Sequence, residues 1–336
     1  MTLYMVSHAS DPDGIIAHAL AKRYAGTQHM RSEHFFIDYA TSESRPQIIT
    51  LDTALEQIQK VDPGSVIIAD TGYPEHLSGN LLSSVASRSS DATWYDHHES
   101  TNKYQDSLTE LGYRVVQDQG SCAAQLMRED LGLQDLYEMM LAELGDVHDY
   151  LRIHHDFWPA AEALEEVITS GFSLNKLVSD LAKEQVFNRD FTNLNAGYGG
   201  QVVDDYRRKV ANAIIDLHDN ITVESVCGRE VAFVKMDLVL YMKRGMRELE
   251  KIFEDDNHSI NKPDFSILLT PGINNTMIQG YKEGRNLVPT FCGEFSNGGG
   301  RESRGGFALP QEIYDGSFES QSLFIQKKFA DFFMQR

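Results

Sequence analysis

Acidic and imidazole side chains gather in four short segments of the first half of the chain, where they could bind divalent metal ions. The segments are residues 7–14 (SHASDPDG), 70–72 (DTG), 96–99 (DHHE) and 145–150 (GDVHDY). An aspartate after a strand often serves only as a helix N-cap, so each segment alone also has an ordinary structural interpretation. The joint pattern favours chemistry, because converging carboxylates repel one another unless a cation lies among them.

A mixed set of carboxylates and imidazoles suits Mn²⁺ better than Mg²⁺, which prefers an all-oxygen shell. Five or more ligands exceed what one tetrahedral ion takes, so the pattern predicts two ions about 3.5–4 Å apart. We expect two Mn²⁺, with Mg²⁺ or Co²⁺ as alternatives. Such a pair clamps a phosphoryl oxygen and activates a bridging water, which is the chemistry of phosphate-ester hydrolysis.

Short apolar runs alternate with helical patterns in the same half of the chain. Strands are expected at residues 3–7, 34–39, 65–69 and 92–95, and helices at 14–24, 53–59 and 77–85. This alternation predicts an α/β fold with a mostly parallel sheet flanked by helices. Ligands of such sheets bind beyond the carboxyl ends of the strands, where three of the four segments fall.

The pattern changes twice further along the chain, which predicts two domains. We expect a catalytic domain at residues 1–188, a helical linker at 189–220 and a smaller α/β domain at 221–336, with the active site in the cleft between the domains. The apolar helix expected at 321–333 is either a core element or the face of a homodimer.

Composition narrows the function classes. Thirty basic and 50 acidic residues give a net charge of −20, which argues against binding to duplex DNA. No apolar run reaches the roughly 18 residues that span a bilayer, so no membrane association is expected. The three cysteines form no CxxC pair, and the N-terminus lacks the basic region of a signal peptide; both observations favour a cytoplasmic protein.

The four segments also carry a resemblance. The patterns His8-x-x-Asp11-Pro-Asp13-Gly14, Asp70, Asp96-His97-His98 and Gly145-x-x-x-Asp149 resemble the four motifs of the DHH phosphoesterase superfamily, in the same order and at similar intervals. The resemblance covers roughly residues 1–155. One departure is the spacing of two residues between His8 and Asp11, where family members commonly have one or three.

The resemblance implies a role for each motif residue. One metal would be held by His8, Asp11, Asp70 and Asp149, and the other by Asp13, Asp70, His97 and Asp149. His98 would contact the scissile phosphate or assist proton transfer, and Asp96 would orient an imidazole from outside the metal shell. Asp146, three residues before Asp149, is an alternative ligand, and only one of the two is expected to face the metals.

A glycine-rich segment in the second half is similar to the substrate-binding domain that accompanies this family. The similarity implies that substrate is contacted by Arg285, Gly298, Gly299, Gly300, Arg301 and Arg304. Arg301 stands where the family usually has a histidine, and an arginine would hold an anion without acting as an acid. Phe291, Phe295 and Phe307 flank the segment and could stack on bases.

Three functions follow from these observations. The first is a two-metal phosphoesterase that hydrolyses short single-stranded oligonucleotides, linear or cyclic dinucleotides, or a phosphomonoester of a small nucleotide. The second is an inorganic pyrophosphatase or exopolyphosphatase, for which Lys243 and Arg244 would add positive charge. The third is a metal-binding regulatory protein without catalysis, which the intact Asp96-His97-His98 motif disfavours.

Overall fold

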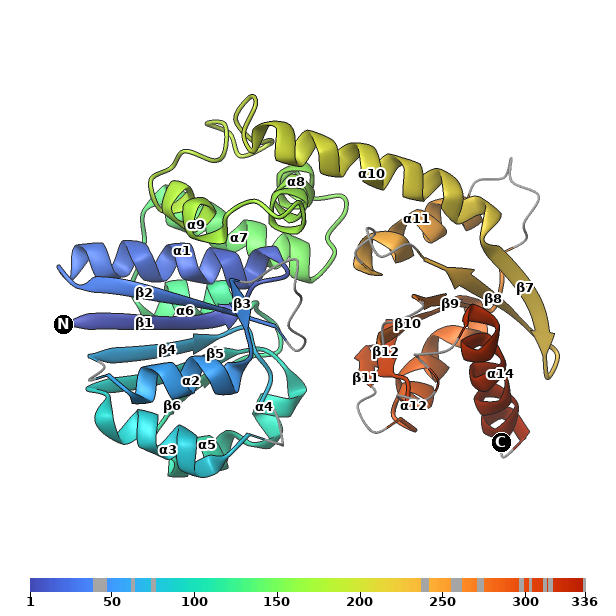
Figure 1. The fold of residues 1–336 in the computed structure, drawn as a ribbon, viewed down its shortest axis with the longest axis horizontal. Helices are drawn as coiled ribbons and strands as arrows, with labels where there is room; N and C mark the ends of the chain where they lie inside the picture. Colours follow the sequence, from blue (N-terminus) through green and yellow to red (C-terminus); the bar gives the residue numbers. More distant parts are fainter. Residues whose placement is uncertain are drawn as a thin grey trace. The chain divides into compact units, whose positions relative to one another are not determined.

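A computed structural model of the chain describes residues 1–38, 47–61, 64–73, 77–236, 242–254, 262–270, 275–295, 299–301, 304–310, 313 and 317–334. The chain divides into two compact units, Met1–Tyr206 and Arg207–Arg336, and each is considered by itself (Figure 1). The division falls inside the 20-residue helix α10 (Gly200–Asp219), part of the segment predicted to be a linker.

Six parallel strands form the sheet of the first unit, in the order β3-β2-β1-β4-β5-β6. Their bounds are β1 Thr2–His8, β2 Arg31–Ile37, β3 Ile48–Ile49, β4 Ser65–Ala69, β5 Asp91–Asp96 and β6 Arg114–Gln117. The predicted α/β class with a parallel sheet is therefore confirmed. The prediction missed β3 and β6, because these short edge strands have no long apolar run.

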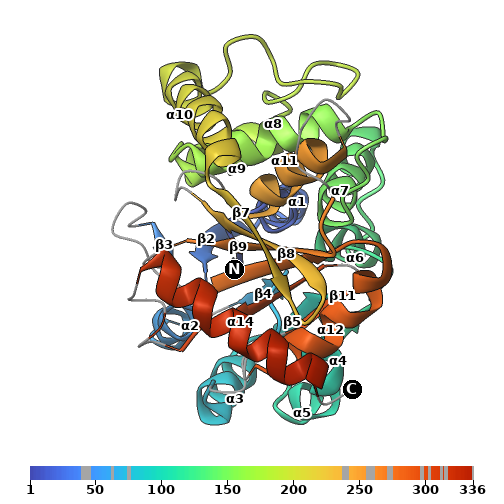
Figure 2. The same cartoon turned by 90° about the vertical axis from the view of Figure 1, so that its right-hand side faces the viewer.

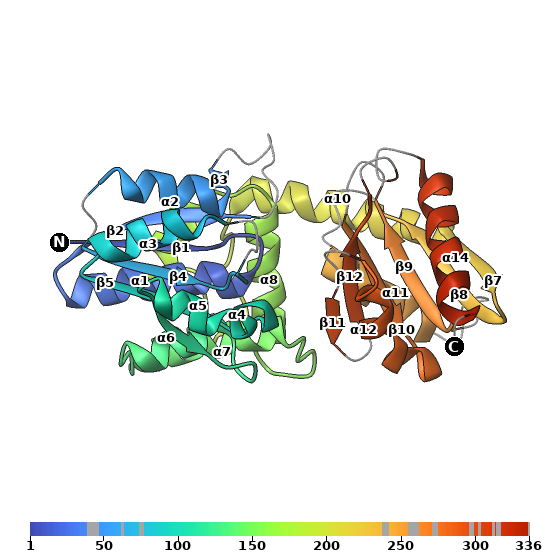
Figure 3. The ribbon, with the colours of Figure 1, turned by 90° about the horizontal axis from the view of Figure 1, so that it is seen from below.

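Helices cover both faces of this sheet. Leu3 and Met5 of β1 belong to one hydrophobic core while Tyr4 and Val6 belong to the other, because successive side chains of a strand point to opposite faces. The first core is completed by α1 (Pro12–Thr27), α6 (Ala123–Asp130), α7 (Leu136–Asp149), α8 (Trp158–Thr169) and α9 (Leu174–Ala182). The second is completed by α2 (Leu51–Gln59), α3 (Gly79–Arg88) and α5 (Gln105–Glu110). Figure 3 shows α2 and α3 in front of the strands.

The order of the strands creates a place for a site. From β1 the chain crosses to β2 on one side, and it later returns to β4 on the other side of β1. The segments that follow β1 and β4 therefore diverge, and this switch in direction is where open α/β sheets bind their ligands. The short helix α4 (Glu99–Lys103) follows β5 at the same edge.

The second unit has its own six-stranded sheet, in the order β11-β12-β10-β9-β8-β7. Its strands are β7 Ile221–Val226, β8 Arg229–Lys235, β9 Phe265–Leu269, β10 Asn275–Gly280, β11 Gly299–Arg301 and β12 Arg304–Ala308. Neighbours are antiparallel except β8 and β9, which are parallel. The other elements are α11 (Met242–Glu254), the 3₁₀ helix η1 (Lys282–Leu287), α12 (Val288–Cys292) and α14 (Phe318–Met334).

The predicted C-terminal helix is α14, and its apolar side packs within the core of the second unit. Ile325, Phe329 and Phe332 are buried there against β9 and α12. Figure 2 shows α14 across this sheet, with α11 near its other face. The helix is therefore a core element of this unit, which is one of the two expected outcomes, while a homodimer stays a prediction.

Among the residues that the structure describes, no helix combines the length and the apolar character needed to cross a bilayer.

Candidate metal centre

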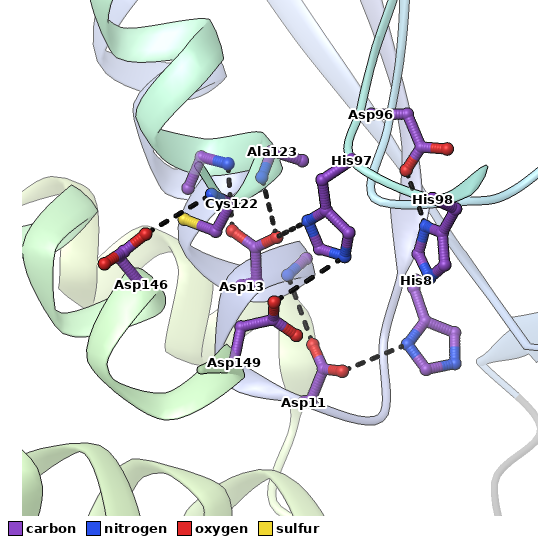
Figure 4. Close-up of polar contacts among 12 residues, drawn as sticks. His8, Asp11, Asp13, Asp96, His97, His98, Cys122, Ala123, Asp146 and Asp149 are labelled. Carbon is purple, nitrogen blue, oxygen red and sulfur yellow. Dashed lines mark hydrogen bonds and ion pairs between the residues drawn. The ribbon is translucent and has the colours of Figure 1, made fainter. Parts of the chain in front are cut away.

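The acidic and imidazole segments meet at one edge of the first sheet. His8 ends β1, Asp96 ends β5, and Asp70 directly follows β4. These strands are parallel, so their carboxyl ends share an edge. The first turn of α1 and the last turn of α7 bring further carboxylates to the same place (Figure 4): Asp11, Asp13 and Asp149.

Two groups of three residues could each hold a metal ion, and they share one member. His8, Asp11 and Asp70 form one group, and Asp70, His97 and His98 form the other. Within each group the ligand atoms lie within 4.8 Å of one another. Asp70, for which the resemblance implies a bridging role, is the residue common to both.

Asp70 shows that this site suits a cation. Its side chain is 4% exposed, and its Oδ2 has no hydrogen-bond partner among the described residues. Burial, followed by the charges of Asp11 and Asp13, raises the pKa of Asp70 well above its ordinary value. Its φ of +48° is a left-handed conformation that a non-glycine residue adopts at a cost. A divalent cation would offset the repulsion among these carboxylates and give the buried oxygen a partner.

The first motif joins the end of β1 to the start of α1 through contacts of His8, Asp11 and Gly14. Asp11 is the N-cap of α1 and accepts from Gly14 N at 3.4 Å, while its other oxygen lies 3.6 Å from Nδ1 of His8. The N-cap interpretation therefore describes this aspartate, and its role as a metal ligand stays a prediction. A Cβ on Gly14 would lie 1.8 Å from the carbonyl oxygen of His8, so only glycine lets α1 begin so close to β1.

Asp13 has a structural function that the sequence did not reveal. Its two oxygens accept from the backbone N–H groups of Ala123 and Ala124, each at 2.9 Å, at the N-terminus of α6. Burial raises the pKa of Asp13 to about 6 even though His97 lowers it. These two hydrogen bonds attach the N-terminus of α6 to the site.

His97 lies between two carboxylates. Its Nε2 is 3.6 Å from Asp149 Oδ2, and its Nδ1 is 3.9 Å from Asp13 Oδ2. The second distance is too long for a hydrogen bond, and the buried Nδ1 has no hydrogen-bond partner in the described part of the chain. This imidazole is therefore available to a metal.

The structure separates the two aspartates of α7. Asp146 Oδ2 pairs with Arg152 at 2.6 Å, and its Oδ1 accepts from Cys122 N at 3.4 Å. Asp146 thus anchors the N-cap of α6, while Asp149 faces His97. This geometry favours Asp149 as the ligand and assigns Asp146 a supporting function.

The imidazole of His98 contacts Asp96. Its Nδ1 lies 2.7 Å from Asp96 Oδ1, and the hydroxyl of Thr101 donates to Asp96 Oδ2. Burial alone would raise the pKa of Asp96, but His98 and Thr101 outweigh burial and lower it. The side chain of His98 remains 38% exposed, so its other ring nitrogen can meet a substrate.

Three residues at the site were not identified from the sequence. Asp38 lies 3.4 Å from Nε2 of His8, and the hydroxyl of Ser10 donates to its second oxygen. Burial lowers the pKa of His8, but Asp11 and Asp38 outweigh burial and raise it to about 10. Thr101 is the third. Asp38 follows β2 as Asp70 follows β4, and this signal in the sequence could have revealed it.

The predicted substrate residues belong to the second unit. Gly299, Gly300 and Arg301 form β11, which pairs with β12, and Arg285 belongs to η1. Gly298 and the side chains of Arg285 and Arg301 lie outside the described residues.

Arg304 is already engaged by neighbours in this unit. Its guanidinium donates to Glu250 at 2.7 Å and to Gln279 at 2.6 Å. The prediction of base stacking is wrong for Phe291 and Phe307, because both are 1% exposed within the hydrophobic core.

Comparisons with known proteins agree with this architecture. No family model and no curated protein matches the sequence. Among solved structures, exonuclease RecJ bound to manganese has a TM-score of 0.55 and 12% identity, over 97% of this chain and 90% of that chain. RecJ of Thermus thermophilus with Mn²⁺ has 0.51 and 13%, over 97% of this chain and 52% of that chain.

An exopolyphosphatase-related protein of Bacteroides fragilis has a TM-score of 0.50 and 14% identity, over 97% of this chain and 91% of that chain. At identities of this size the similarity shows a shared fold and nothing about activity. This chain therefore shares the fold of these structures, and membership of the DHH superfamily stays a prediction of its four motifs.

Proposed function

We propose that this chain is a metal-dependent phosphoesterase that hydrolyses phosphodiester or phosphomonoester bonds of short nucleotides. The observation that carries the proposal is the pair of ligand groups joined by the buried carboxylate of Asp70. An unpartnered carboxylate oxygen among other carboxylates is expensive unless it binds a cation, so the arrangement is that of a functional site.

The residues present fit two divalent ions of the Mn²⁺ type, with Mg²⁺ or Co²⁺ as alternatives. His8, Asp11 and Asp70 would hold one ion. Asp70 and His97 would hold the other, with Asp13 and Asp149 within reach of His97. His98, the third member of that group, would contact the substrate instead. When bound, such ions polarise a phosphoryl oxygen and lower the pKa of a water.

The side chains around these ligands have their own parts in the proposal. Asp96 holds Nδ1 of His98, so Nε2 of this partly exposed side chain would donate a hydrogen bond to the scissile phosphate or pass a proton to the leaving oxygen. Ala123 and Ala124 fix Asp13, which therefore needs little reorganisation when a ligand binds.

Short nucleotides are favoured over long polyanions by the charge of the chain. A net charge of −20 offers little attraction to duplex DNA or to a long polynucleotide. Inorganic polyphosphate would need several unpaired cations, and Arg304 is already paired with Glu250. Arg301 with Arg285 would then bind the substrate phosphate as two-pronged donors.

One assay tests the proposal against its alternatives. The purified chain with Mn²⁺ is incubated with a labelled dinucleotide, a cyclic dinucleotide, a pentanucleotide, a DNA duplex, pyrophosphate and polyphosphate. Turnover of the short nucleotides supports the proposal. Orthophosphate from the inorganic substrates alone would identify a pyrophosphatase or exopolyphosphatase, and inactivity on all would indicate a non-catalytic protein.

His97→Ala should abolish the turnover, whereas Asp204→Asn, on the exposed side of α10, should leave it unchanged. Near wild-type activity of His97→Ala would contradict the assignment of the site.

A further inference from the structure

Asp38 is the first residue after β2, the strand beside β1, and its side chain contacts His8 of the proposed metal centre. Its Oδ1 lies 3.4 Å from Nε2 of His8, and its Oδ2 accepts from the hydroxyl of Ser10. The other ring nitrogen of His8, Nδ1, is 3.6 Å from Asp11 and faces the ligand cluster (Figure 4). The His8 ring thus lies between an outer carboxylate and the metal ligands.

The sheet itself creates this contact. His8 and Ile37 are register partners at the ends of β1 and β2, and Ala9 N donates to Ile37 O at 3.0 Å. The chain after β1 therefore continues beside the end of β2 for one more residue, which brings the next side chain, Ser10, to Asp38. The spacing of two residues between His8 and Asp11 accommodates this step.

The same arrangement occurs at the other side of the centre. There the hydroxyl of Thr101 donates to Asp96, whose second oxygen holds Nδ1 of His98. In both places a hydroxyl fixes one oxygen of a strand-end carboxylate, and the other oxygen fixes an imidazole. The same hydroxyl–carboxylate–imidazole arrangement thus occurs at the ends of two strands, β2 and β5, which argues against an accidental contact at Asp38.

We propose that Asp38 is a positioning residue for His8, an inference that rests on the proposed metal centre. Asp38 accepts the Nε2–H of His8, so that Nδ1 carries the lone pair and faces Asp11. A histidine that binds a metal through one nitrogen is usually held through the other, which fixes its tautomer and orientation. Ser10 restricts the rotation of Asp38 and completes the arrangement.

The test measures Mn²⁺ binding, and it uses Asp38→Asn with a charge-matched control. Glu33→Gln removes one negative charge from an exposed position of the same strand. Free Mn²⁺ is quantified by electron paramagnetic resonance during a titration. We expect Asp38→Asn to weaken Mn²⁺ binding about 10–100-fold and Glu33→Gln to leave it unchanged.

Pulsed electron paramagnetic resonance of the bound Mn²⁺ adds a measurement that a general loss of stability would not change. At saturating Mn²⁺, Asp38→Asn should change the ¹⁴N coupling from the histidine ligands, because the ring of His8 is no longer fixed. Ser10→Ala keeps the carboxylate and should weaken binding only about 3-fold, which provides a milder variant if Asp38→Asn folds poorly.

Wild-type affinity together with unchanged ¹⁴N coupling in Asp38→Asn would overturn the inference. Equal weakening by Glu33→Gln would also overturn it, because the effect would then be one of net charge. If the wild type binds Mn²⁺ but hydrolyses no phosphate ester, the proposed function fails while the weakened binding of Asp38→Asn still supports the positioning role.

Discussion

Replacing Asp70 by asparagine should stabilise the metal-free protein while it abolishes metal binding. Asp70 is buried among carboxylates with one unpartnered oxygen, and burial and those charges raise its pKa. Asparagine removes the charge, can donate to the neighbouring carboxylates, and tolerates the φ of +48° at least as well as aspartate. If Asp70 binds metal as proposed, its carboxylate is placed there at a cost to folding, as is common at functional sites.

The expected size follows from the buried group. An unpaired buried polar group costs about 1–3 kcal/mol, and each kcal/mol shifts the melting temperature of a unit of this size by about 2–4 °C. We therefore expect Asp70→Asn to melt roughly 2–12 °C above the wild type in EDTA. The wild type should gain about 2.7 kcal/mol from Mn²⁺ at one hundred times its Kd, and the variant should gain nothing.

Thermal unfolding in EDTA and in Mn²⁺ measures both effects, with Asp204→Asn as the control for loss of an exposed charge. The reasoning is refuted if Asp70→Asn melts below the wild type in EDTA. It is equally refuted if the variant keeps the full Mn²⁺-dependent shift, because Asp70 would then not be a ligand.

Three further predictions concern other parts of the chain. Burial lowers the pKa of His34 from 6.5 to about 4, so the unfolded chain binds more protons than the folded chain between these pH values. About 3 kcal/mol of stability should therefore be lost as the pH falls from 6.5 to 4. Urea denaturation at several pH values should show that the stability of His34→Gln depends less on pH than that of the wild type. Asp149→Asn should abolish turnover and weaken Mn²⁺ binding measured by calorimetry. Asp146→Asn should retain Mn²⁺ binding and lose about 1–2 kcal/mol of stability. If Asp146→Asn lost Mn²⁺ binding and Asp149→Asn kept it, the two assignments would be exchanged. Arg304→Ala and Glu250→Ala should each lower stability, and a double-mutant cycle should give a coupling of about 0.5–1 kcal/mol for this pair, whose side chains are about one quarter exposed. Simple additivity would mean that the pair contributes nothing.

Much of the fold was predictable because it depends on local patterns. The apolar runs of β1, β4 and β5 are short and bounded, and strand–helix alternation leads to a parallel sheet. Polar residues that directly follow such strands must lie at one edge. The types and spacing of His8, Asp70 and His97 therefore indicated a metal centre before any contact was known.

Other features depend on contacts between segments that are distant in the sequence. That Asp149 and not Asp146 faces His97 follows from the packing of α7 against the start of α6, where the backbone N–H of Cys122 donates to Asp146. Arg152, just after α7, pairs with the same carboxylate. Two aspartates three residues apart on one helix look alike until the neighbouring elements are placed.

The sequence by itself determined the class of fold and the set of candidate ligands, because both follow from periodicity and from the chemistry of side chains at strand ends. Only the tertiary structure decided that Asp38 holds His8, that Arg304 pairs with Glu250, and that Phe291 lies in the core. Each depends on which strands and helices lie side by side, and that adjacency is set by non-local packing rather than by spacing along the chain.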